Sequence, residues 1–188
     1  MTMPLKGKHI AFLFTEGVEQ AELMEPLRSV EAAGGDTTLL SIDGGVVQMF
    51  NAHERGDQIE AELSVAEADP DQFDGLVLPG GVADPDALRV HDHAVSFIRA
   101  FFEQGKPVGV ICHAPWTLIE ADVVRGRTLT SWPSLQTDLR NAGANWVDVS
   151  VHVDNGLVSS RDPADLPAFC EKLVQTFAQA GRASHEVA

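Results

Sequence analysis

Short apolar stretches recur along the chain and predict the strands of a buried sheet. They cover residues 9–14, 37–42, 75–79 and 108–111. Residues 10–14 are apolar at every position, which is typical of a strand covered on both faces, as in the centre of a parallel sheet. The pattern therefore indicates a sheet buried between two layers of helices.

Apolar residues at helical spacing separate these strands. Leu23, Leu27 and Val30 share one face and predict a helix that ends near Ala33, before Gly34-Gly35. Further helices are expected over residues 92–104, from 115 onward, and over 133–141 and 163–180, the last with an apolar stripe that includes Cys170. Alternating strands and helices predict an α/β fold, a flavodoxin-like sandwich with a mostly parallel sheet and helices on both faces.

Several segments have a weaker pattern. Residues 46–50 are expected to form a small antiparallel addition, whereas 52–72 alternate between charged, alanine and apolar positions and are given no strand. A strand is expected over 127–131, and residues 146–153 and 157–160 predict an antiparallel hairpin around the Asn155-Gly156 turn. We expect a single domain over residues 1–188, with an ordered core over 9–180, a leader over 1–8 and a frayed tail over 181–188.

Composition narrows the function classes. The chain has 28 acidic and 13 basic residues and a net charge of -15, which disfavours binding to nucleic acid or anionic membranes. It has only two cysteines and no visible signal peptide or long apolar span, so we expect a reducing, cytoplasmic location. No nucleotide-binding glycine motif is present, so no cofactor is expected.

The most informative stretch is the end of the 108–111 strand. Cys112 follows this strand, and Pro115 suits the first turn of a helix, so the cysteine falls on a strand-to-helix turn known as a nucleophile elbow. Helix N–H groups near such a thiol favour the thiolate, its reactive form. The alternative is that Cys112 is a small apolar core residue, as we expect for Cys170. His113 is the nearest candidate base, although its side chain could also face away from the thiol.

A glycine pair follows the 75–79 strand and enters the same predicted crevice. N–H groups of Gly80 and Gly81, together with that of Ala114, are candidates to bind an oxyanion, although the pair could also be a plain tight turn. Asp84 and Asp86 follow closely and are candidate carboxylates to orient a catalytic histidine, or simply residues of a turn.

One other cluster has the residue types of a metal site. His91-Asp92-His93 lies just before a predicted helix, without a second cluster of ligands elsewhere in the sequence. A solvated helix start is the better interpretation, and no metal site is predicted.

Four ordered motifs carry a resemblance that spans most of the chain. They are residues 19–26 (EQAELMEP), 74–81 (DGLVLPGG), 105–113 (GKPVGVICH) and 158–166 (VSSRDPADL). In these segments the chain resembles the PfpI family, the intracellular protease I group. That group lies in the superfamily that includes the Parkinsonism-associated deglycase and the class I glutamine amidotransferases.

The resemblance implies roles for two glutamates. Glu22 corresponds to a carboxylic acid that hydrogen-bonds the cysteine, and Glu19 is its usual companion. Pro26 lies one turn later and leaves the carbonyl of Glu22 without its usual helical partner. An ionised carboxylate would repel a thiolate, so Glu22 must be buried and have a raised pKa to act as a donor.

In proteolytic members a carboxylate from a neighbouring subunit completes the cysteine–histidine pair. The chain differs from the proteolytic members in the segment that carries this carboxylate. Residues 82–86 contain one extra residue and have Asp in place of Glu, which weakens the expectation of peptidase activity. A homodimer or larger assembly is implied. The amidotransferases place their histidine far downstream; His152 and Asp154 fit that spacing, but the Asn155-Gly156 turn makes them the end of a hairpin.

Two function classes follow. In the first, the protein is a stress-associated, cofactor-free cysteine hydrolase or lyase that acts on small carbonyl compounds, glycated amines or peptides through a covalent intermediate on Cys112. In the second, it is a redox-sensing or chaperone-like stress protein whose Cys112 is oxidised to a sulfenic or sulfinic acid. Both classes use the same cysteine and its surroundings.

Overall fold

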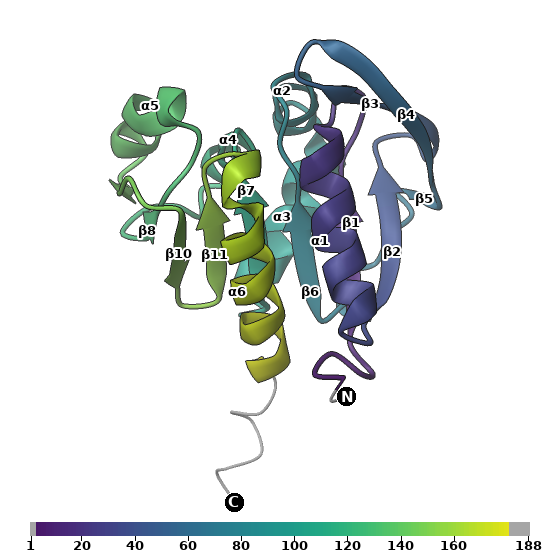
Figure 1. The fold of residues 1–188 in the computed structure, drawn as a ribbon. Helices are drawn as coiled ribbons and strands as arrows, with labels where there is room; N and C mark the ends of the chain where they lie inside the picture. Colours follow the sequence, from purple (N-terminus) through teal and green to yellow (C-terminus); the bar gives the residue numbers. More distant parts are fainter. Residues whose placement is uncertain (1–2, 181–188) are drawn as a thin grey trace, which may run out of the picture.

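The computed structural model describes residues 3–180 and has a main sheet of seven strands (Figure 1). Their order across the sheet is β10-β11-β7-β6-β1-β2-β5. The strands are β1 (His9–Leu13), β2 (Asp36–Ser41), β5 (Leu63–Ser64), β6 (Gly75–Leu78), β7 (Val108–Ile111), β10 (Val151–Asp154) and β11 (Leu157–Ser160). All neighbouring pairs are parallel except β10 and β11, so the predicted mostly parallel sheet is confirmed.

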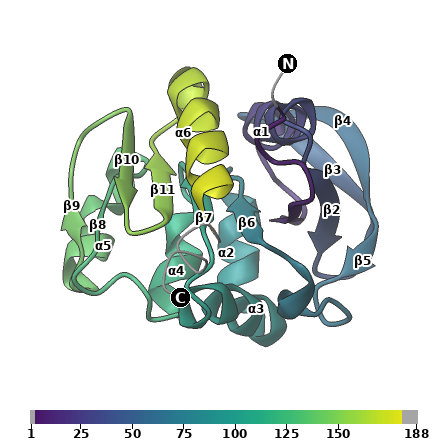
Figure 2. The same cartoon turned by 90° about the horizontal axis from the view of Figure 1, so that it is seen from below.

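Helices cover both faces of this sheet (Figure 2). On one face lie α1 (Gln20–Ala32) and α6 (Leu166–Gln179), and on the other α2 (Ala83–Arg89), α3 (Asp92–Glu103) and α4 (Pro115–Glu120). Each face has its own apolar core: Phe12 of β1 and Phe169 of α6 are fully buried on the side of α1 and α6, and Leu76 and Phe101 are fully buried on the side of α3. The flavodoxin-like sandwich is thereby confirmed, and half-buried Cys170 packs against the core of the first face, as expected.

A two-stranded antiparallel sheet lies outside the main sheet. Its strands are β3 (Gly45–Asn51), which confirms the expected addition near 46–50, and β4 (Glu54–Ala61), which the sequence did not predict. Most side chains of β4 are polar and exposed, so the strand lacks the apolar alternation that marks a half-buried strand. Its pairing with β3, rather than burial, makes it a strand.

The predictions for residues 127–153 are wrong in detail. The expected strand over 127–131 is only the two-residue β8 (Thr128–Leu129), which pairs with β9 (Asn145–Trp146) in a separate small sheet. The expected strand over 146–153 is therefore divided between β9 and β10, and only its second half joins the hairpin with β11. The predicted helix over 133–141 is a 3₁₀ turn followed by α5 (Gln136–Asn141).

The loop expected after Gly81 is also different, because residues 83–89 form α2. Asp84 and Asp86 thus lie in a helix rather than a loop, and Asp84 is fully buried.

Pro26 lies inside α1, which continues through it to Ala32. None of the helices within residues 3–180 is long and apolar enough to cross a membrane. The tail predicted for 181–188 lies outside the described residues.

Candidate active site

Cys112 occupies a strained turn between β7 and α4. Its φ is +63°, a left-handed conformation that costs a residue with a side chain about 1–2 kcal/mol. Two backbone hydrogen bonds hold it: its N–H donates to the carbonyl of Ser160 at 3.1 Å, and its carbonyl accepts from the N–H of Trp132 at 2.9 Å. The strand-to-helix turn predicted from the sequence therefore has the geometry of an elbow.

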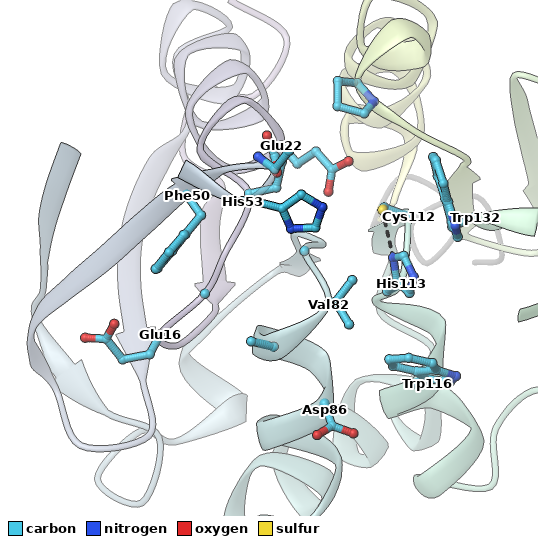
Figure 3. Close-up of a pocket in the computed structure, with 16 residues that line it drawn as sticks. Glu16, Glu22, Phe50, His53, Val82, Asp86, Cys112, His113, Trp116 and Trp132 are labelled. Atoms are coloured by element: carbon cyan, nitrogen blue, oxygen red, sulfur yellow. Dashed lines mark hydrogen bonds between the residues drawn. The ribbon is translucent and has the colours of Figure 1, made fainter. Parts of the chain in front are cut away.

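His113 faces the thiol rather than away from it. Its Nδ1 lies 3.1 Å from Sγ of Cys112 (Figure 3). Burial lowers the pKa of His113, so the imidazole is neutral at neutral pH and can accept a proton. Its ring stacks on Trp132 with centroids 5.8 Å apart and meets Trp116 edge-on at 5.1 Å, which fixes its orientation.

Glu22 extends from α1 toward the sulfur and is completely buried (Figure 3). Burial, and then the charge of Glu19, raise its pKa to about 8; contacts with the Cys112 side chain and the N–H of Gly80 lower the pKa, but by less. Neither carboxyl oxygen makes a hydrogen bond of ordinary geometry to the described residues. At neutral pH the group is mostly a neutral acid with a proton to donate.

The charge state of Cys112 departs from expectation. Burial raises the pKa of its thiol, and negative charge on Glu22 raises it further, whereas the N–H groups of Gly81 and His113 lower it. The N–H groups thus favour the thiolate, as expected, but burial outweighs them. Because negative charge on Glu22 raises the pKa of the Cys112 thiol, the titrations of the two groups are coupled.

The N–H groups around the sulfur divide into three kinds. Those of Gly81 and His113 act on the sulfur itself, and they are the donors placed to meet a developing oxyanion. The N–H of Gly80 acts on Glu22 instead. The N–H of Ala114 donates to the carbonyl of Ile111 at 3.1 Å, away from the sulfur, so its oxyanion role stays a prediction.

The two candidate aspartates lie apart. Asp84 accepts a hydrogen bond from the N–H of Thr15, and burial raises the pKa of its carboxyl well above the usual range. It makes no hydrogen bond to His113 within this chain, so its role as the orienting carboxylate stays a prediction. Asp86 is exposed and lines the pocket that leads to Cys112.

That pocket has a volume of about 1090 Å³ and ends at Cys112 and Glu22. Sequence reasoning missed most of its walls: Glu16, Phe50, His53, Val82, Trp116, Trp132 and Pro163. Trp116 was open to prediction, since it lies in the first turn of the helix that follows the elbow, three residues after His113. Phe50 and His53 belong to the β3–β4 hairpin, whose position over the site has no signal in the local sequence.

Glu19 holds that hairpin in place. Its carboxylate accepts a hydrogen bond from the N–H of Ala52 at 2.9 Å, while its own N–H donates to the carbonyl of Gly80 at 3.0 Å. The next residue, Gln20, exchanges two hydrogen bonds with Asp57 of β4, at 2.7 and 2.8 Å. The start of α1 thus connects the glycine loop to the hairpin above the pocket.

His91 and His93 lie away from this pocket. His91 caps the N-terminus of α3, where its Nδ1 accepts a hydrogen bond from the N–H of Ala94. The interpretation of this cluster as a helix start is confirmed.

Comparison with known proteins adds to this geometry. Residues 8–176 match the model of the DJ-1/PfpI family. A deglycase of Thermococcus kodakarensis is 40% identical over 166 residues, which are 88% of this chain and 97% of the relative. Protein/nucleic acid deglycase 2 of Escherichia coli is 42% identical over 164 residues, 87% and 94% of the two chains. The crystal structure of Drosophila melanogaster DJ-1beta has a TM-score of 0.83 and 28% identity over 97% of this chain and 93% of that one.

Proposed function

Because the chain belongs to the DJ-1/PfpI family, we propose that it is a cysteine-dependent hydrolase of the deglycase type. It would release amines or thiols from adducts with small reactive carbonyl compounds. The observation that carries this proposal is the contact of the Cys112 sulfur with both a neutral imidazole, His113, and a buried carboxylic acid, Glu22, at the end of a wide pocket. The deglycase names of the relatives agree with it.

The first step uses the Cys112–His113 pair. Nδ1 of His113 accepts the thiol proton as Sγ forms a bond to the carbonyl-derived carbon of the adduct. The bond from that carbon to the amine or thiol breaks, and the leaving group departs with the proton that His113 accepted. Glu22, still protonated, donates to oxygen or sulfur where negative charge develops.

Water completes the cycle. His113 removes a proton from water, the hydroxyl displaces Sγ from carbon, and the proton returns to the thiolate. The carbonyl fragment leaves as its hydrate, so no oxidant or reductant is required. The N–H groups of Gly81 and His113 stabilise the negative charge that develops on Sγ as it leaves carbon in the second step.

The protein is also proposed to assemble as a homodimer or larger oligomer, as the family resemblance implies. Asp86, exposed at the pocket, is then the carboxylate available to approach His113 of a neighbouring subunit, because Asp84 is buried and bonded to Thr15. Sedimentation of the purified protein tests the assembly, and a monomer at all concentrations would contradict it.

A turnover assay tests the proposed chemistry. The purified protein is given a methylglyoxal hemithioacetal, a glycated amine and a fluorogenic peptide, each beside Cys112→Ala and the control Cys170→Ala. We expect release of thiol or amine that Cys112→Ala abolishes and Cys170→Ala leaves unchanged. Turnover that survives in Cys112→Ala, or none in the unmodified protein, would contradict the proposal.

A redox-sensing role is the second candidate. It is favoured by the two unpaired oxygens of Glu22 beside the sulfur, because a neutral acid there could donate to a sulfinate. Intact mass after mild peroxide treatment tests it: a gain of two oxygens on Cys112 supports this role, and an unchanged mass contradicts it.

A further inference from the structure

We propose that the pocket selects its substrates by charge, admitting cationic adducts and rejecting anionic ones such as glycated nucleotides. This inference rests on the proposed function and deepens it. It concerns the part of the substrate that leaves, beyond the carbon that Cys112 attacks.

Three carboxylates line the pocket that leads to the sulfur of Cys112. Glu16, Glu19 and Asp86 line the pocket from three separate segments, and its walls, within the described residues, include no lysine or arginine. A phosphate in this pocket would lose water and meet three carboxylates, with no lysine or arginine among the lining residues to pair with it. A guanidinium or ammonium group would instead meet carboxylate acceptors.

A second observation points to a bound ligand. Glu22 is 0% exposed, lines the inner end of the same pocket, and has two carboxyl oxygens without hydrogen-bond partners. A buried polar group without a partner is costly, and a substrate in the pocket could supply one. Any negative charge brought close to Cys112 would oppose the negative charge that develops on its sulfur during the reaction.

The aromatic walls are also suited to a cation. Trp132 remains 40% exposed at the pocket, while Trp116 already has the guanidinium of Arg89 at 5.6 Å from its ring centroid. That arginine is paired with Glu120 at 3.4 Å and is not among the residues that line the pocket. Tryptophan faces attract ammonium and guanidinium groups, so the wall and the carboxylates favour the same kind of ligand.

We infer that this chain and the E. coli relative differ in the substrates that they accept. That relative's name includes nucleic acid as well as protein. In this chain, the carboxylates at the pocket and the net charge of -15 act together against phosphate-bearing substrates. The leaving group we infer carries a positive charge or none.

The test uses three hemithioacetals of methylglyoxal whose far ends differ in charge. Their thiols are thiocholine (cationic), 2-mercaptoethanol (neutral) and 2-mercaptoethanesulfonate (anionic). At neutral pH and low salt we expect the KM of the cationic adduct to be about tenfold lower than that of the anionic one, with similar kcat values. High salt should reduce the difference. Equal KM values, or a preference for the anionic adduct, would overturn the proposal.

Substitutions in the pocket identify the carboxylates that cause the preference for the cationic adduct. Glu16→Gln combined with Asp86→Asn should reduce the ratio of the KM values of the anionic and cationic adducts at least threefold, whatever change in kcat follows from the loss of Asp86. Glu25→Gln, an exposed position on α1 outside the pocket, is the matched control and should keep the full preference. A preference unaffected by the double variant would refute the assignment to these carboxylates.

A second measurement does not depend on turnover. In a Cys170→Ser background, Cys112 is modified with methanethiosulfonates that carry a trimethylammonium or a sulfonate group, each rate being divided by that of free cysteine. A normalised rate about tenfold higher for the cationic reagent supports charge selection, even if no adduct is turned over and the proposed function fails. Equal rates overturn charge selection, whatever the turnover assay gives.

Discussion

The carbonyl of Cys112 accepts a hydrogen bond from the backbone N–H of Trp132 at 2.9 Å, although the two residues are twenty positions apart. This bond joins the nucleophile elbow directly to the aromatic wall of the pocket. With the bond from Cys112 to Ser160 on the other side, it holds the left-handed backbone at Cys112 from two directions. The sulfur is therefore positioned by the backbone rather than by a mobile side chain alone.

Gly80 leaves the space in which Glu22 and Cys112 meet. A Cβ at this position would overlap Oε2 of Glu22 and lie 2.6 Å from Cβ of Cys112. We predict that Gly80→Ala separates the acid from the sulfur and lowers kcat/KM by at least about tenfold, since small displacements of catalytic groups are costly. Steady-state kinetics and the rate of Cys112 alkylation measure this effect.

Gly105→Ala is the matched control for that substitution. Its φ is +65° and no atom lies within 4 Å of an added Cβ, so the change strains the backbone without touching the site. It should cost about 1 kcal/mol of stability and leave kcat/KM unchanged. Equal activity of the two variants would contradict the packing role assigned to Gly80.

The buried acid should make stability depend on pH. The pKa of Glu22 is raised from 4.5 to about 8 in the folded protein, which therefore keeps a proton that the unfolded chain has released. The free energy of unfolding therefore decreases with increasing pH. Between about pH 4.5 and about pH 8 it falls by an amount on the order of 5 kcal/mol. We predict that Glu22→Gln removes this loss, whereas Glu25→Gln does not.

Urea unfolding at pH 5.5 and pH 8 measures the effect. Between these values the stability of Glu22→Gln should increase relative to that of the unmodified protein. A difference between the two proteins that stays constant with pH would mean that Glu22 is already ionised at pH 5.5.

His113 is predicted to act in proton transfer. Replacing it by Gln keeps a polar group near Sγ but removes the base, so kcat should fall about 10²-fold or more with little change in KM. His93→Gln, at an exposed position outside the pocket, is the control and should retain full activity. A kcat for His113→Gln within a few-fold of the unmodified value would assign proton transfer to another group.

The elbow could be predicted because its information is local. A short apolar strand, a cysteine and a proline three residues later define the turn within a few positions. The hairpin of β10 and β11 was predictable for the same reason, since Asn155-Gly156 specifies the turn between them. The role of Glu22, in contrast, came from the family resemblance, because an acidic residue on a helix is ordinarily solvated.

The parts of the fold and the site that could not be predicted depend on contacts between distant segments. Asp84 follows a glycine loop and looks like a turn residue, yet it is buried because Thr15, far away in sequence, donates a hydrogen bond to it. The polar strand β4 exists through its pairing with β3, and that pairing brings His53 and Phe50 over the pocket. Neither position follows from residue types in the local sequence.

The most direct test of the account is the pH dependence of Cys112 alkylation by iodoacetamide, in a Cys170→Ser background, with and without Glu22→Gln. If the titrations of the sulfur and the acid are coupled, the rate in the parent protein should rise in two steps, the first near pH 8. With Glu22→Gln it should rise in one step, at a lower pH than the second step of the parent, because the negative charge that raises the thiol pKa is gone. Single steps at the same pH in both proteins would contradict the coupling on which the proposed mechanism depends.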